Sequence, residues 1–277
     1  MIEVVRAGPL TTIQDRGRPG WAHIGVPPSG ALDLPALEAA LALVGGDAGD
    51  AMLETTVRGP ALRAATALTF AVTGAPAAIT VDGTPAVHGA AHAVAAGALI
   101  EIGAASAGLR SYVAFSGGID GPPVLGSRAT DLLTGLGPPP LRDGDRFTLG
   151  PAHGHPREAA TPATPQAGPV TLRIVAGPRD DWFSTGLDGR AYTASPASNR
   201  TGLRLTGPPL ARARDGELRS EGIVTGAIQV PPSGEPIVLL ADHPTTGGYP
   251  VIGVVVHDDL PLAAQVRPGQ EVRFEIA

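Results

Sequence analysis

Short segments in which apolar and more polar residues alternate constrain the fold of this chain more than any other feature. The alternation is clear at 68–73, 170–174 and 272–276. A period of two residues is typical of a strand with one buried and one solvated face. Glycine (38 residues) and proline (29 residues) are spread between these segments, which favours many strands joined by tight turns. The pattern therefore predicts a mainly β fold.

Two other signals agree with this interpretation. The runs 237–241 and 251–256 are continuously apolar, as expected of strands buried on both faces. The pairs Asp82-Gly83, Asp143-Gly144 and Asp215-Gly216 favour the backbone conformations of hairpin turns.

Helical signals are few. Asp33 is a suitable N-cap for a helix over 34–44, which places its leucines on one face and ends at Gly45-Gly46. The N-terminal N–H groups of this helix are a candidate anion site. A second, short helix is expected at 128–136, with Ser127 or Thr130 as its cap.

The segment 151–169 has no periodicity and is rich in proline and alanine, which is typical of a linker or exposed loop. We therefore expect a first half at 1–150 and a second half at 170–277. The sequence Val-Pro-Pro-Ser-Gly occurs at 26–30 and again at 230–234. This recurrence indicates an internal duplication, with chance similarity as the alternative.

Composition excludes several classes of function. The net charge of −6 argues against nucleic-acid and anionic-membrane partners. All 20 basic residues are arginine, so the chain has no Walker A lysine, no Schiff-base lysine and no lysine to carry biotin. With no cysteine there is no thiol nucleophile or thiolate metal site. We expect a cytoplasmic protein without a metal site.

The stretch 8–33 holds polar side chains in a frame of glycines and prolines, as a binding loop does. Asp15 beside Arg16 and Arg18 is suited to holding a carboxylate or phosphate. The alternative is a solvated salt bridge in a turn. Gln14 and Ser29 belong to the same stretch, Ser29 with a simple capping role as its alternative.

The loop 242–250 follows a predicted buried strand directly, and such loops often carry functional sites. Asp242 and His243 provide acid–base groups. Gly247 and Gly248 leave backbone N–H groups open to a developing negative charge, and Tyr249 follows them. We favour a functional interpretation of this loop over a turn without chemistry.

Three further polar clusters lie between predicted strands. Arg128 follows a glycine-rich turn and suits an oxyanion or phosphate. Asn199 and Arg200 are candidate orienting donors, and Glu221 is a candidate base. Turn chemistry is the alternative for each of them.

The motifs GPLTTIQDRGRPG, SNRTGLRL and SEGIVTGAIQVPPSGEPIVLLADHPTTGGYPVIG, in this order, resemble the biotin-dependent carboxyltransferase family. This family includes proteins called allophanate hydrolase subunit 2 and the C subunit of bacterial 5-oxoprolinase. The resemblance runs nearly end to end, with a gap at 151–169. It implies a cyclophilin-like β-barrel architecture with two pseudo-repeated subdomains. The family usually has asparagines or a basic residue where this chain has Leu41, Gly46 and Val251.

By this resemblance, the chain is expected to be the C subunit of an ATP-dependent 5-oxoprolinase, which opens 5-oxoproline to glutamate together with the A and B subunits. ATP with Mg would be shared with these partner subunits, and biotin would not be attached to this chain. Two alternatives stay open. One is biotin-dependent carboxyl transfer to a urea-like amide, and the other is a non-catalytic antagonist of a histidine-kinase inhibitor.

In the 5-oxoprolinase hypothesis the candidate residues take two kinds of role. The catalytic candidates are Asp15, Glu221, Asp242 and His243. The candidates for binding substrate or phosphate are Gln14, Arg16, Arg18, Ser29, Arg128, Asn199, Arg200, Gly247, Gly248 and Tyr249.

Overall fold

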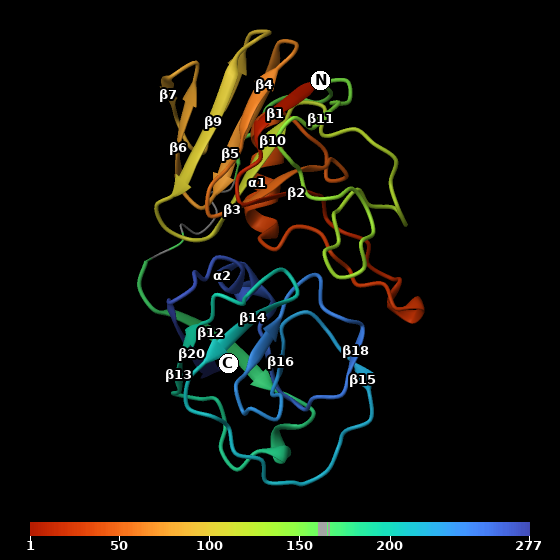
Figure 1. Ribbon diagram of the computed structural model, residues 1–277, viewed down its shortest axis with the longest axis vertical. Coiled ribbons are helices and arrows are strands. Elements are labelled where there is room, and N and C mark those ends of the chain that lie inside the picture. The colour runs from red at the N-terminus through yellow and green to blue at the C-terminus, as the bar shows by residue number, and fades with distance from the viewer. Residues whose placement is uncertain (160–164, 166) are drawn as a thin grey trace. The chain divides into compact units, whose positions relative to one another are not determined.

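The computed structural model describes residues 1–159, 165 and 167–277, which form two compact units (Figure 1). The first unit comprises Met1–Arg18, Asp33–Asp131 and Gly135–Pro165, and the second comprises Pro19–Leu32, Leu132–Thr134 and Gln166–Ala277. Both units are discontinuous in sequence, whereas the expected halves are continuous. The linker predicted at 151–169 lies partly outside the described residues, and the internal duplication stays a prediction.

Two β-sheets make up most of the first unit. Among the described residues, one sheet has the strand order β11-β1-β4-β9-β6-β7 and the other the order β2-β3-β10-β5-β8. Apolar residues from both sheets form one buried cluster, so the sheets pack face to face. The strands are β1 (Ile2–Arg6), β2 (Leu10–Gln14), β3 (Met52–Thr56), β4 (Ala61–Ala64), β5 (Leu68–Gly74), β6 (Ala77–Val81), β7 (Thr84–Ala86), β8 (Ala91–Val94), β9 (Leu99–Ala105), β10 (Arg110–Phe115) and β11 (Arg146–Phe147).

Helix α1 (Leu34–Val44) has the predicted bounds and the predicted cap. The Asp33 side chain accepts a hydrogen bond from the Ala36 N–H at 3.0 Å, and Gly45 ends the helix in the left-handed conformation. The helix packs on β5 and β10. Since β10 also faces the core between the sheets, all its residues are buried.

The second unit is built on a closed barrel. Among the described residues its strand order is β12-β19-β16-β17-β14-β13-β20, and parallel pairing of β12 with β20 closes it. The barrel strands are β12 (Val170–Ala176), β13 (Ala191–Ala194), β14 (Gly202–Thr206), β16 (Ala227–Gln229), β17 (Ile237–Leu239), β19 (Val251–Val255) and β20 (Glu271–Ile276). The other elements of this unit are β15 (Glu221–Gly222), β18 (Thr246–Gly247), α2 (Leu260–Ala264) and the 3-10 turns η1 (Ala22–Ile24), η2 (Asp180–Trp182) and η3 (His257–Asp259).

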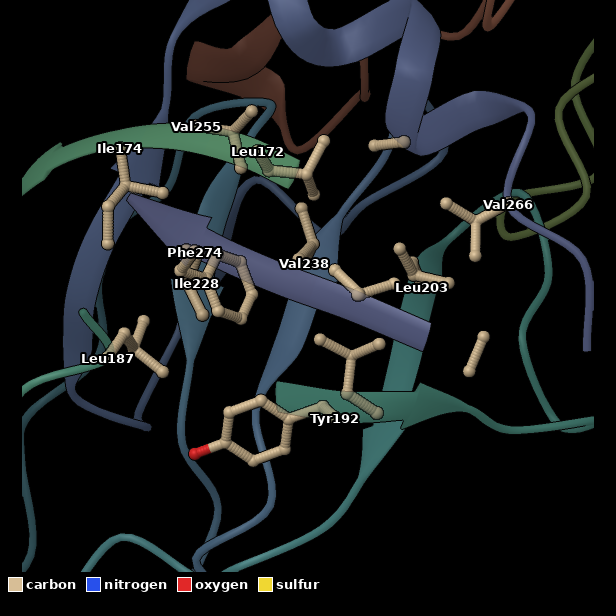
Figure 2. Close-up of a cluster of buried hydrophobic side chains, with 14 of the residues drawn as sticks. Leu172, Ile174, Leu187, Tyr192, Leu203, Ile228, Val238, Val255, Val266 and Phe274 are labelled. Carbon is tan, nitrogen blue, oxygen red and sulfur yellow. The ribbon is translucent and has the colours of Figure 1, made fainter. Parts of the chain in front are cut away.

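Alternate residues of the barrel strands fill its interior. Figure 2 shows Leu172 and Ile174 of β12 beside Phe274 of β20, with Tyr192 of β13 and Leu203 of β14 completing the cluster. All five side chains are at most 5% exposed. The period-two pattern of the sequence therefore encodes the barrel core directly.

The predicted fold class is confirmed: the chain is mainly β, with a β-barrel and, among the described residues, two α-helices. The strands predicted at 68–73, 170–174 and 272–276 are β5, β12 and β20, and the apolar runs at 237–241 and 251–256 contain β17 and β19.

Two local predictions are wrong. No helix forms over 128–136, because backbone N–H groups there donate to distant partners. Arg128 donates to Asp15, and Thr130 to the Ile13 carbonyl at 2.8 Å. Of the three Asp-Gly pairs, Asp82-Gly83 alone connects two paired strands within the described chain, β6 and β7.

None of the helices formed by the described residues is both long and apolar enough to cross a membrane. The expected cytoplasmic location stays a prediction.

Candidate functional site

Asp15 lies in the first unit directly after β2, and its carboxylate joins that strand end to the turn at 127–128. It accepts hydrogen bonds from the Ser127 hydroxyl at 2.6 Å and from the Arg128 and Gly17 N–H groups, each at 2.7 Å. The residue is 5% exposed. With three donors on a buried carboxylate, the geometry supports a positioning role; the predicted catalytic role stays a prediction.

The two arginines predicted beside Asp15, Arg16 and Arg18, and the separately predicted Arg128 have different environments. Arg16 is exposed and forms an ion pair with Glu38. Arg128 donates from Nε to the Gly121 carbonyl at 2.7 Å. Arg18 is 1% exposed and donates from Nη2 to the Ala129 carbonyl. The guanidinium groups therefore do not form one common clamp.

Two buried polar side chains of this region keep atoms without partners among the residues that the structure describes. These atoms are Nη1 of Arg18 and Oε1 of Gln14. The amide nitrogen of Gln14 donates to the Thr12 hydroxyl and to the Thr130 carbonyl, each at 3.0 Å. The β2 end is thus tied to the 124–130 segment by side chains that sequence reasoning selected for binding.

In the second unit, Asp242 and Arg200 form a sealed ion pair. Arg200 Nε and Nη2 lie 2.9 and 3.0 Å from the two carboxylate oxygens, and the side chains are 1% and 0% exposed. The carboxylate also accepts from the Ser29 hydroxyl at 2.7 Å and the Leu132 N–H at 3.1 Å. Because four donors surround it, Asp242 is well suited to hold these segments together.

Ser29 occupies its place at a conformational cost. Its φ of +52° is in the left-handed region, which a residue with a Cβ rarely adopts. The backbone N–H donates to the Ala241 carbonyl at 3.0 Å, and the hydroxyl donates to Asp242. These two contacts fix the strained residue beside the end of the 237–241 strand segment.

His243 is buried beside Asp242 and faces a different pair of groups. Nδ1 lies 2.7 Å from the Pro244 carbonyl, and Nε2 lies 3.2 Å from the Thr225 hydroxyl. Burial lowers the pKa of His243 below its ordinary value, an effect that the Pro244 carbonyl and the Asp242 charge oppose. The neutral imidazole is therefore the favoured form near neutral pH.

The segment 221–225 runs antiparallel to 243–247, so several predicted residues meet at one edge of the second unit. Glu221 is the register partner of Gly247 in the β15–β18 pair, and the Ile223 N–H donates to the Thr245 carbonyl at 3.0 Å. Gly248 and Tyr249, which follow β18, are exposed. We call Glu221, Gly247, Gly248 and Tyr249, with Arg179 described next, the Glu221 edge.

Sequence reasoning missed Arg179 at this edge. Its Nε lies 3.2 Å from Glu221 Oε2, and its Nη2 contacts Oε1, so the two side chains form a bidentate ion pair. Hydrogen bonding to Glu221 raises the pKa of Arg179. A usable signal was the Ala-Gly-Pro at 176–178, which repeats Ala-Gly-Pro at 7–9, just before the first polar loop.

Asn199 is accounted for by turn geometry, because its Oδ1 accepts from the Thr201 and Gly202 N–H groups at 2.8 and 3.3 Å. Two other partners were also missed, Ser127 for Asp15 and Thr225 for His243.

The two ion pairs of the second unit differ in what they can do. The Asp242–Arg200 pair is closed to solvent, so it can position segments. In the Arg179–Glu221 pair the side chains are 34% and 35% exposed, so a small molecule can reach both charges. Acid–base and anion-binding chemistry is therefore more accessible at the Glu221 edge.

The sequence is similar to a family and to proteins of known name. A family described as carboxyltransferase domain, subdomain A and B, matches residues 24–276. The chain is 39% identical to the 5-oxoprolinase C subunit of Escherichia coli strain K12, over 99% of this chain and 90% of that protein. It is 33% identical to the 5-oxoprolinase C subunit of Haemophilus influenzae, over 99% and 91% respectively.

Among solved structures, the urea amidolyase of K. lactis matches with a TM-score of 0.94 and 29% identity. The match covers 99% of this chain and 18% of the urea amidolyase chain.

Proposed function

The chain belongs to the family described as carboxyltransferase domain, subdomain A and B, and we propose that it is the C subunit of an ATP-dependent 5-oxoprolinase. The observation that carries this proposal is the 39% identity to a 5-oxoprolinase C subunit over 99% of this chain and 90% of that protein. The reaction hydrolyses a five-membered lactam, 5-oxoproline, to glutamate. The A and B subunits of the enzyme are the proposed partners.

The Glu221 edge is the part of this chain that we assign to the reaction. Hydrolysis of a lactam requires proton transfer to or from water and the ring nitrogen, and a partly exposed carboxylate such as Glu221 can do this. We propose that the N–H group of Gly248, an exposed residue, donates to the carbonyl oxygen that gains negative charge. Asp242 and Asp15, both buried under several donors, are assigned to positioning.

The glycine-rich turn at 117–118 does not fit a phosphate cradle. The Gly118 N–H donates to the Phe115 carbonyl at 2.9 Å, and the following Ile119 N–H donates to Ala51 at 2.8 Å. A Cβ at Gly117 would lie 2.2 Å from the Gly150 carbonyl oxygen, so this turn is packed against the chain itself. We therefore propose that ATP and Mg are held mainly by the partner subunits.

The test is ATP-dependent release of glutamate from 5-oxoproline by this chain co-expressed with the A and B subunits. Omission of each subunit in turn should abolish turnover. Glu221→Gln should lower kcat by about 10²- to 10⁴-fold, as expected for loss of a general acid–base group. Glu38→Gln is the matched control, since Glu38 is also an exposed partner of an arginine but lies in the first unit.

Two results would contradict the proposal. Turnover that is unchanged when this chain is omitted would show that it is not a required subunit. Equal activity of the Glu221→Gln and Glu38→Gln complexes would remove the Glu221 edge from the reaction.

A second candidate is carboxyl transfer from biotin to a urea-like amide. It is supported by the description of the family and by the TM-score of 0.94 to a urea amidolyase. Since the chain has no lysine, biotin would be carried by a partner. Streptavidin blotting of proteins that co-purify with the chain tests this candidate, and a blank blot would remove it. The kinase-inhibitor alternative stays a prediction.

A further inference from the structure

We infer that Arg179 binds the carboxylate of an anionic substrate by exchanging it for the carboxylate of Glu221. The inference rests on the proposed function and deepens it, because it assigns the residue that distinguishes an anionic lactam from a neutral amide.

Arg179 is held rigidly by its backbone beside the start of β19. Its N–H donates to the Val251 carbonyl at 3.1 Å, and the Gly177 N–H donates to the Ile252 carbonyl at 2.9 Å. A Cβ at Gly177 would lie 2.4 Å from the Val251 oxygen, so the turn depends on a glycine there. The base of the arginine side chain is therefore fixed, and only the guanidinium end has to adjust.

Burial distinguishes Arg179 from Arg200 and Arg18, two of the arginines that sequence reasoning selected. Arg200 is 1% exposed, with Asp242 across its fork. Arg18 is likewise 1% exposed and lies in the first unit. The Arg179 side chain is 34% exposed. A substrate can thus reach Arg179 without opening the core of either unit.

Glu221 already shows which ligand the Arg179 fork accepts. The carboxylate contacts both Nε and Nη2 of the guanidinium, the side-on arrangement that arginine uses for carboxylates in general. A substrate carboxylate can take the same two positions. Since partly exposed ion pairs contribute little net stability, displacing Glu221 from the fork costs little.

The loop beside the fork is held in place by packing and by a hydrogen bond. Gly247 packs against the side chains of Ile223 and Gln229, where a Cβ would lie only 2.6–2.7 Å from them. The Gln229 amide donates to the Tyr249 carbonyl at 3.3 Å. Exchange would leave the Glu221 carboxylate released beside exposed Gly248, next to the bound lactam.

The inference gives this chain a basis for substrate choice. 5-Oxoproline carries a carboxylate that can bind the Arg179 guanidinium, whereas urea and simple amides are neutral and have no carboxylate to bind it. Arg179 is thus a recognition residue for the anionic group of the substrate, and Glu221 is its resting-state counter-ion.

The experiment measures binding by calorimetry to the complex of the A and B subunits with this chain. The ligands are 5-oxoproline and 2-pyrrolidinone, which has the same lactam ring without the carboxylate. Arg179→Gln should weaken 5-oxoproline binding by about 10- to 100-fold and leave 2-pyrrolidinone binding unchanged. Arg214→Gln is the matched control, because Arg214 is an exposed arginine of the same unit paired with Asp181.

Glu221→Gln separates exchange from a structural role. Removing the competing carboxylate should tighten 5-oxoproline binding by up to about fivefold, while a purely structural ion pair would give weaker binding or no change. Equal effects of Arg179→Gln on both ligands, or none on 5-oxoproline, would overturn the inference.

The outcomes also distinguish this inference from the proposed function. Normal turnover with a KM that is insensitive to Arg179→Gln refutes the inference alone. Binding of 5-oxoproline that depends on Arg179, in a complex without turnover, refutes the proposed activity and leaves the recognition of the carboxylate standing.

Discussion

Replacing Asp242 by alanine should destabilise the second unit severely. The carboxylate is fully buried and accepts four hydrogen bonds, two of them from Arg200. Removing one member of a buried ion pair typically costs about 3–5 kcal/mol, because the other charge loses its partner carboxylate while it stays out of water. We therefore expect Asp242→Ala to lower the free energy of unfolding by about 4 kcal/mol.

Tryptophan fluorescence during urea unfolding measures this effect in the second unit, which contains Asp242. The chain has two tryptophans, Trp21 and Trp182, and both belong to the second unit. With a denaturant slope of about 2 kcal/mol/M, a loss of about 4 kcal/mol lowers the midpoint by about 2 M urea. The slope itself should not change.

Two control variants test the reasoning. Asp181→Ala removes an aspartate that pairs with an arginine at 51% exposure, so it should cost about 0–1 kcal/mol. Asp242→Asn preserves the volume of the side chain and removes its charge, so it should still lose at least about 2 kcal/mol. If Asp242→Ala and Asp181→Ala shift the midpoint equally, the burial argument is refuted.

Three further predictions concern single residues. Burial lowers the folded-state pKa of His243 below its ordinary value of 6.5, so the contribution of His243 to stability is complete above about pH 6.5 and is lost as the pH falls through the folded-state pKa. The urea midpoint, measured at about pH 5–8, should therefore fall as the pH is lowered, and His243→Gln should make this fall smaller. Gly117→Ala places a Cβ 2.2 Å from a backbone oxygen at φ +89° and should cost about 2 kcal/mol more than Gly83→Ala, which has φ +78° and open space; equal calorimetric melting temperatures would contradict this. Tyr112→Phe removes a buried hydroxyl bonded to a carboxylate and a backbone N–H and should cost about 1–3 kcal/mol in urea unfolding, whereas Tyr249→Phe, 46% exposed, should stay within about 0.5 kcal/mol.

The elements that could be predicted are those whose signals are local. Helix α1 carries its cap at Asp33 and its terminator at Gly45 within its own sequence, so its bounds follow from neighbouring residues. Strands β5, β12 and β20 are predicted because alternation every second residue reflects burial of one face. The same kind of local reasoning wrongly predicted a helix at 128–136, because backbone N–H groups of this segment donate to Asp15 and Ile13, more than a hundred residues away.

The candidate site could be predicted in composition but not in arrangement. The motifs selected Glu221, Asp242 and His243, and the structure gives them different surroundings. Glu221 lies opposite Gly247 and pairs with Arg179, whereas Asp242 pairs with Arg200 and His243 contacts Thr225. The recurring Val-Pro-Pro-Ser-Gly motif shows the limit of motif reasoning. Ser29 is buried on Asp242, while Ser233 is exposed in a turn.

By itself, then, the sequence determined a mainly β chain with one well-capped helix, without lysine or cysteine, and with its polar loops identified. Which of the charges are sealed and which are reachable was decided by the tertiary structure alone. Arg200 and Arg179 are both arginines of polar loops, yet one lies at 1% exposure on Asp242 and the other at 34% on Glu221. Exposure depends on how distant segments pack, and no local pattern of residues encodes it.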